Sequence, residues 1–376
     1  MGSIEEVEAN MSFSIKKVFY VLAVLFGISA LLFFGRPVIV PMAFALLISF
    51  ILYPVCRFIE AKGVGRLWSI LWTMLGVALF LVGLITLFGS QIVKIMQDFT
   101  DFSNRLHEIL ASLTSFINEK VSILPNVSEN DIMDMSKDWF SSKGNKLVGA
   151  MLNNTSEFIT GFVLTVIYAF LLLLYRNGLK RAFVNFAASD KQEDYAHMID
   201  NMQRVGQKYL TGMFTLIVIL GALNSIGLLL LGIDYAIFFG YLAAFLAIIP
   251  YVGTLIGGAI PTLYAFMNYD SIWYPLGVVL IFWFVQMLEG NFLSPKIVGG
   301  NLNLNALVAI IALIIGGSVW GIPGMILFLP FTAVFKVACE HYKQLKPISY
   351  LLRNDLYKKE ENEGSLKKKM QKILKK

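Results

Sequence analysis

Long apolar runs that contain no charged residue dominate the pattern of hydrophobic and polar positions. They occupy residues 18–35, 37–56, 67–93, 158–175, 209–233, 235–269, 271–288 and 297–335. A helix of about 20 apolar residues crosses the roughly 30 Å hydrocarbon core of a bilayer. Continuous runs of this kind exclude an outer-membrane barrel, which would show short segments of alternating hydrophobicity. The pattern predicts an all-α, polytopic helical membrane protein.

Two of the runs are too long to be single crossings. At about 1.5 Å per residue, residues 235–269 and 297–335 would form straight helices of roughly 52 and 58 Å. Each run contains a cluster of helix-breaking residues, which we expect to divide it into two half-helices or two short crossings. The expected total is about seven or eight transmembrane segments, with broken or re-entrant helices in the C-terminal half. The break and hinge candidates are Pro250, Tyr251, Gly253, Gly257, Gly258 and Pro261 in the first run, and Gly316, Gly317, Gly321, Pro323 and Gly324 in the second.

The composition supports a membrane protein and narrows the possible functions. Hydrophobic residues make up 57% of the 376 residues and charged residues 15%, against about 25% charged residues in soluble proteins. Mean hydropathy is +0.69. These values argue against a soluble enzyme, a disulfide-stapled secreted domain and a nucleic-acid-binding protein. Cys56 and Cys339 lie alone in apolar surroundings, and we interpret both as reduced core residues.

Basic residues set the expected orientation, because cytoplasmic loops of membrane proteins are rich in Lys and Arg. Basic residues precede the first run, follow the second and fill residues 176–208, whereas residues 94–157 carry 6 basic and 9 acidic residues. The tail ends in a lysine-rich stretch from Lys367 to Lys376, typical of a cytoplasmic end held near anionic lipid. No cleavable signal peptide is evident, so the first apolar run is expected to be retained. We expect a multi-pass protein of the bacterial cytoplasmic membrane with both termini in the cytoplasm.

The same charges and runs predict the organisation of the chain. The predicted parts are the first three crossings (1–93), an external helical hairpin (94–157), a fourth crossing (158–175), a cytoplasmic amphipathic segment (176–208), a transmembrane core with Gly/Pro-broken helices (209–340) and a basic cytoplasmic tail (341–376). Within the amphipathic segment, Asp190 with Glu193 resembles a capping box that begins a helix.

A heptad pattern marks the start of the external hairpin. Apolar residues follow a 4-3 spacing, as in a coiled-coil seam, at Ile95, Phe99, Phe102, Leu106, Ile109, Leu113 and Phe116. The returning helix of the hairpin could cover this stripe within one subunit. The alternative, which we carry forward, is a homo-oligomer that forms contacts through residues 94–120.

Motifs of enzyme chemistry are missing from the sequence. The three histidines lie in separate segments, and no pattern resembles HExxH, CxxC, a phosphate-binding GxxxxGK[ST] loop or a GxSxG nucleophile elbow. We therefore expect no metal, no cofactor and no catalytic activity, and any transport would proceed without ATP hydrolysis.

Polar residues at membrane depth are the remaining candidates for function, because they are costly unless they face protein or a water-filled cavity. The densest group lies between two apolar runs. Glu289 and Lys296 are seven residues apart, a spacing that allows an ion pair. In a purely structural alternative, these residues cap helices at the interface, and the break near Pro250 is only a packing kink. The transport-path candidates are Gln286, Glu289, Asn291, Pro295 and Lys296, together with Pro250, Tyr251 and Gly253.

Several short motifs together resemble the autoinducer-2 exporter family of bacterial permeases. They are the Pro250-Tyr-Val-Gly253 break with Gly257, Gly258 and Pro261, the polar stretch from Gln286 to Gly300, and the glycine-rich stretch from Gly316 to Met325 with Pro330. The resemblance covers about residues 12–345. It implies a secondary or passive transporter, associated in some members with autoinducer-2 export and in others with sodium or lithium/proton antiport. The sequence departs from the family at Gly212-Met213, where Gly-Gln is common, and at Asn305-Ala306, where His-Pro is common.

The leading hypothesis is a permease that exports a small polar solute, with autoinducer-2 as the candidate. One alternative is a sodium or lithium/proton antiporter in which Glu289 carries the proton. A second alternative is an oligomeric membrane scaffold without transport activity. The expected partners are the lipid bilayer, a small polar solute or monovalent cation and further copies of the chain, with no nucleic acid.

Overall fold

The computed structural model describes residues 15–98, 145–249, 252–299 and 304–354. Most of the predicted external hairpin, including the stripe from Phe99 to Phe116, lies outside these ranges, as do Pro250, Tyr251 and the lysine-rich tail. The helices are α2 (Ile15–Phe34), α3 (Arg36–Glu60), α4 (Arg66–Asp98), α7 (Asn145–Asn185), α8 (Gln192–Leu230), α9 (Ala236–Leu246), α10 (Val252–Asn268), α11 (Trp273–Leu288), α13 (Ala306–Trp320), α14 (Ile322–His341) and α15 (Lys346–Leu352).

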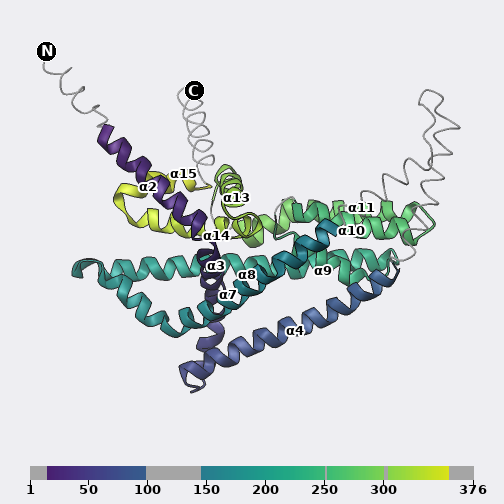
Figure 1. The fold of residues 1–376 in the computed structure, drawn as a ribbon, viewed down its shortest axis with the longest axis horizontal. Helices are drawn as coiled ribbons and strands as arrows, with labels where there is room; N and C mark the ends of the chain where they lie inside the picture. Colours follow the sequence, from purple (N-terminus) through teal and green to yellow (C-terminus); the bar gives the residue numbers. More distant parts are fainter. Residues whose placement is uncertain (1–14, 99–144, 250–251, 300–303, 355–376) are drawn as a thin grey trace, which may run out of the picture.

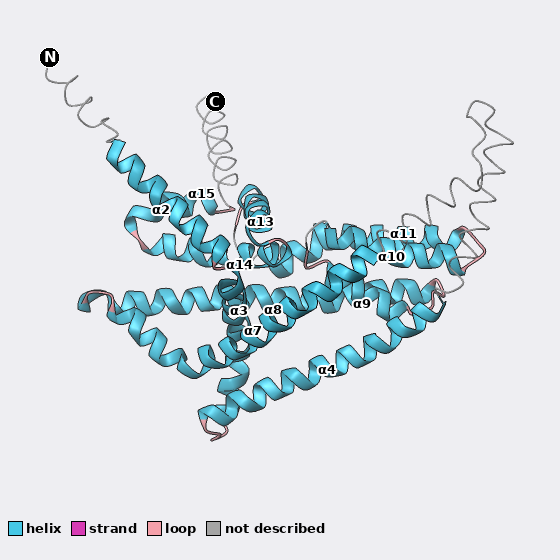
Figure 2. Ribbon diagram, in the orientation of Figure 1, coloured by secondary structure: helices cyan, strands magenta, loops and turns pink. Residues whose placement is uncertain are grey.

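The predicted fold class is confirmed. Within the described ranges the chain is helical, and its only β-type pairing is an isolated bridge between Leu304 and Arg353 (Figure 2). Six helical stretches in those ranges are long and apolar enough to cross a membrane, and three shorter apolar helices accompany them. The apolar runs form helices because a helix satisfies its own backbone hydrogen bonds in hydrocarbon. The chain is a polytopic helical membrane protein.

Both overlong runs are divided into two helices. The first run forms α9 and α10, and the second forms α13 and α14. Gly321 separates α13 from α14 with φ 66° and ψ −141°, a conformation that an L side chain rarely adopts. The other described break candidates lie within helices instead: Gly253, Gly257, Gly258 and Pro261 are in α10, Gly316 and Gly317 in α13, and Pro323 and Gly324 in α14. Pro323 is in the first turn of α14, where its missing N–H leaves no hydrogen bond unmade.

The segment 176–208, predicted to be amphipathic, is divided between two long helices. The helix α7 extends through its first part to Asn185, and α8 begins at Gln192 and continues to Leu230. A short turn with a 3₁₀ segment at Ser189–Lys191 joins them, and Lys180 pairs with Asp200 across the two helices. The capping prediction for Asp190 is wrong, because Lys191 is the N-cap of α8 and no side chain makes a cap hydrogen bond there.

Helix α8 organises the part of the fold that surrounds the candidate site. It packs against α9, α11 and α14, while α10 packs against both α9 and α11. Figure 1 shows α9, α10 and α11 gathered along one end of α8, whereas α4 runs as a long diagonal helix at the edge of the molecule. The largest apolar cluster lies among these helices, with Leu228, Phe239 and Val278 at its centre. Four helices therefore converge at the break between α9 and α10.

Candidate functional site

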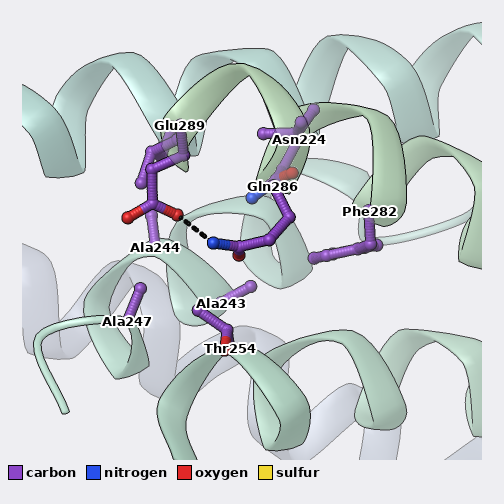
Figure 3. Close-up of a pocket in the computed structure, with 10 residues that line it drawn as sticks. Asn224, Ala243, Ala244, Ala247, Thr254, Phe282, Gln286 and Glu289 are labelled. Carbon is purple, nitrogen blue, oxygen red and sulfur yellow. Dashed lines mark hydrogen bonds between the residues drawn. The ribbon is translucent and has the colours of Figure 1, made fainter. Parts of the chain in front are cut away.

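A small, partly open pocket lies where α8, α9, α10 and α11 meet. Helix α9 ends at Leu246 and α10 begins at Val252, so the broken helix borders the pocket from both sides. Its polar lining comes from Asn224, Thr254, Gln286 and Glu289, and its apolar lining from Leu220, Ala243, Ala244, Ala247, Phe282 and Val285. Figure 3 shows the side chains of Asn224, Gln286 and Glu289 converging on one space. A polar site within an apolar helical bundle thus lies beside a helix break.

Glu289 stands where α11 changes from an α-helix to a π-helix. The π-helical segments are Glu289–Leu293 and Pro295–Gly299, and the Ser294 N–H bonds to the Glu289 carbonyl five residues earlier. Pro295 has no N–H to donate to the carbonyl four residues earlier, which disfavours regular α-helix here. Such π turns occur frequently at functional sites.

Two neutral groups hold the Glu289 carboxylate. The Gln286 amide Nε2 donates to Oε2 at 2.8 Å, and the Ser294 hydroxyl donates to Oε1 at 3.3 Å. Lys296 is exposed, and the ion pair with Glu289 that the spacing allows is not among those formed in the described ranges. The wider π turns between these two residues change the angular relation that an α-helix would give them.

Asn224 is a site residue that the sequence analysis missed. It lies on α8 and is 5% exposed, and its side-chain Oδ1 is buried with no hydrogen-bond partner among the residues that the structure describes. A buried acceptor left unpaired costs about 1–3 kcal/mol, so a donor or cation in the pocket would satisfy it. The available signal was an amide within the apolar run 209–233, since polar residues at membrane depth mark functional sites.

The other predicted path residues lie away from the pocket lining. The Asn291 amide donates to the Met287 carbonyl of its own helix at 2.8 Å, and Pro295 and Lys296 are exposed. Pro250 and Tyr251 are not described. Gly253 contributes indirectly, because a Cβ there would collide with the Leu246 carbonyl across the α9–α10 break. The structure thus brings Gln286 and Glu289 together at the pocket and leaves the other described candidates outside its lining.

The lining determines what kind of ligand the pocket suits. Its charged member is Glu289, and the unpaired Asn224 oxygen is a second acceptor. Acceptors of this kind match a solute that carries hydroxyl donors, or a monovalent cation. The described residues contain no group of three or more His, Cys, Asp or Glu side chains arranged to hold a metal ion.

Asn305, where the family often has His, has a different task. Its Oδ1 caps α13 by accepting from the Val308 N–H at 2.8 Å, and its Nδ2 donates to the Leu351 carbonyl at 2.6 Å. This side chain therefore fastens α15 to the start of α13 and does not line the pocket.

Comparisons with known proteins agree with this architecture. A model of the AI-2E family transporters matches residues 19–344. Two Bacillus subtilis (strain 168) relatives, YrrI and YueF, are each 27% identical to the chain, and neither is named for a substrate. The alignments cover 83% of this chain and 88% of YrrI, and 88% of this chain and 93% of YueF. The AI-2 transport protein TqsA of Escherichia coli (strain K12) is 25% identical over 332 residues, or 86% of this chain and 92% of TqsA. Because the family match spans most of the sequence, the chain belongs to the AI-2E family of transporters.

Proposed function

We propose that this protein exports a small polar solute across the bacterial cytoplasmic membrane without ATP hydrolysis, through the pocket beside the α9–α10 break. Autoinducer-2 is the candidate solute, because the relative TqsA is named for AI-2 transport. The supporting observation is the acceptor-lined pocket formed by Asn224, Gln286 and Glu289. Broken helices whose ends meet at a polar site are a recurring feature of secondary transporters.

The pocket geometry supports direct contact between the solute and two side chains, those of Glu289 and Asn224. Gln286 already donates to one carboxylate oxygen of Glu289, which orients the carboxylate in the pocket. A hydroxyl of the solute would donate a hydrogen bond to the Glu289 carboxylate or to the Asn224 oxygen. This bond would replace the one that the hydroxyl made to water before the solute entered the pocket. Apolar side chains such as Phe282 and Val285 would cover the carbon skeleton.

A flux measurement with purified protein in proteoliposomes tests this proposal. Glu289→Gln should abolish or strongly reduce autoinducer-2 flux while the protein still assembles. Asn291→Ala is the matched control, because Asn291 lies on the same segment but bonds to its own backbone. Equal loss in both variants, or wild-type flux in Glu289→Gln, would contradict a path through this pocket.

Sodium or lithium/proton antiport is the second candidate function, and one feature of Glu289 favours it. Among the residues that the structure describes, the partners of its carboxylate are two neutral side chains, and no basic side chain there pairs with it to compete with a proton or a cation. A pH gradient should then drive cation flux into proteoliposomes, and Glu289→Asp should retain part of that flux whereas Glu289→Gln should not. A scaffold without transport activity would show neither cation nor solute flux.

Assembly through residues 94–120 remains a proposal from the heptad pattern. If the stripe joins subunits, replacing Phe102, Leu106 and Ile109 by Ser should lower the mass of the detergent-solubilised complex. An unchanged mass would confine the stripe to one subunit.

A further inference from the structure

A second polar cluster lies at one end of α3, α4 and α7, far along the chain from the pocket residues. Glu60 is the last residue of α3, Arg66 the first of α4, and Arg176 follows the apolar run 158–175 of α7. The three apolar runs of these helices therefore reach their polar boundary together, as helices do where a membrane ends. Below the cluster lies an apolar core formed by Leu52, Cys56, Ile70 and Leu173.

Both arginines contact one turn of α7. Arg176 belongs to this turn, and Arg66 reaches it from α4. Arg176 forms an ion pair with Glu60, and the Nη2 of Arg66 approaches the carbonyl of Leu173, three residues before Arg176, at 3.5 Å. The Tyr53 ring supports the Arg176 guanidinium, whose Cζ lies 5.0 Å from the ring centroid. Arg66 and Arg176 are thus held on the same side of α7.

Several hydrogen-bonding atoms of this cluster have no partner in the described ranges. Arg66 Nε, Arg176 Nε and Nη1, and one oxygen of Glu60 are buried without a partner in the part of the chain that the structure describes. The side chains of Arg176 and Glu60 are 15% and 24% exposed, so the cluster borders the surface. The cluster contains two positive charges and one negative charge. It therefore combines several free donors and a net positive charge with a single free acceptor.

We propose that Arg66 and Arg176 bind the phosphate of an acidic phospholipid whose headgroup carries hydroxyls, such as phosphatidylglycerol. Phosphate oxygens accept from the free guanidinium donors, because Arg matches the geometry of oxyanions. A headgroup hydroxyl donates to the free Glu60 oxygen. Basic pockets between transmembrane helices at headgroup level are known lipid sites. This inference does not depend on which solute the protein transports.

Binding of phosphatidylglycerol to the delipidated full chain in detergent tests the proposal. Native mass spectrometry should show that the wild-type chain retains phosphatidylglycerol in preference to phosphatidylcholine. Arg66→Gln should weaken this retention roughly tenfold, the loss expected for one charge-assisted hydrogen bond. Arg181→Gln, on an exposed residue of α7, makes the same change in net charge and should leave retention unchanged.

Three results would overturn the proposal. Equal weakening in Arg66→Gln and Arg181→Gln would reduce it to general attraction between a basic surface and an acidic lipid. Displacement of the lipid by inorganic phosphate at millimolar concentration would assign the site to a free anion. Equal retention of phosphatidylglycerol and phosphatidylcholine would show that the cluster is hydrated and does not bind an acidic headgroup. If Arg66→Gln does not fold, Arg66→Lys decides the matter, because it keeps the charge and removes the Nε donor, and it too should weaken retention.

Discussion

At the scale of single residues, the pocket depends on polar atoms whose bonding is incomplete. Glu289 is held by Gln286 and Ser294, whereas the buried oxygen of Asn224 is unpartnered within the described ranges. An unpaired buried acceptor does not stabilise the fold, so its presence on α8 is better explained by a ligand than by packing.

Asn224→Ala should separate function from stability. The Oδ1 has no hydrogen bond to lose, so the unfolding midpoint in detergent should change little, while solute or cation flux should fall. The control is Ser225→Ala, at a neighbouring buried residue whose hydroxyl approaches the Ile237 carbonyl at 3.5 Å. Wild-type flux in Asn224→Ala would remove this residue from the transport path.

Gly324→Ala should destabilise the pairing of α13 and α14. A Cβ at Gly324 would collide with the Gly316 carbonyl, and one at Gly316 with the Gly324 carbonyl. Overpacking of this kind costs about 1–3 kcal/mol, to be measured by thermal unfolding in detergent. At Gly290 an added Cβ meets no atom within 4 Å, so Gly290→Ala should not lower the midpoint in the same way. An equal drop in the unfolding midpoint of Gly324→Ala and Gly290→Ala would show that the close approach of α13 to α14 is unimportant for stability.

At the scale of elements, the helix pairs of the C-terminal half are held by a few specific contacts. The Trp320 indole N–H donates to the Leu32 carbonyl at 2.9 Å, which ties the end of α13 to α2. The connection from α8 to α9 passes through Tyr235, which has a positive φ of 56°, and is braced by Tyr269 from the end of α10. The first contact fixes the end of α13, and the second fixes the start of α9, which borders the pocket.

Tyr269→Phe should loosen the α8–α9 connection. The Tyr269 hydroxyl accepts from the Asp234 N–H at 2.8 Å and lies 3.0 Å from the Gly232 carbonyl, to which it donates. Burial raises the pKa of Tyr269, and the Asp234 carboxylate adds to the shift. The folded state therefore holds this proton more tightly than the unfolded state, and the resulting stability is present below the ordinary value near 10 and lost as pH rises above it.

The measurement is thermal unfolding of wild type and Tyr269→Phe across that alkaline range. Wild type should be the more stable at neutral pH, and the difference should shrink as the phenol ionises. A difference that does not change with pH would assign the effect to packing alone.

At the scale of the whole molecule, the charge pattern predicts that residues 94–157 lie outside and residues 176–208 inside. The helices α7 and α8 meet at the 186–191 turn, which therefore has to lie on one side of the bilayer. The clusters around Arg176 and around Glu289 can then be placed relative to the two membrane faces once the side of this turn is known.

Cysteine labelling provides that orientation. Single cysteines at Ser128 and at the exposed Ser189 should react from opposite sides, the first from outside only. Cys56 and Cys339 are buried and should contribute little background. Labelling of both positions from the same side would overturn the predicted topology.

Features that depend on local physics could be predicted from the sequence. Runs of apolar residues predicted membrane helices, because a backbone in hydrocarbon has to satisfy its own hydrogen bonds. Run length and helix breakers predicted that residues 235–269 and 297–335 each form two helices, as the break at Gly321 shows.

Contacts between residues far apart in the chain could be seen only once the helices were packed together. Asn224 lies more than 60 positions before Glu289, and Arg66 lies 110 before Arg176, so periodicity carries no information about either encounter. Lys296 also does not pair with Glu289 in the described ranges despite a favourable α-helical spacing, because the π turns after Leu288 change their angular relation. Packing of α8 against α9 and α11, and of α3 against α7, brings these side chains together, because burial of apolar faces positions the few polar groups that those faces carry.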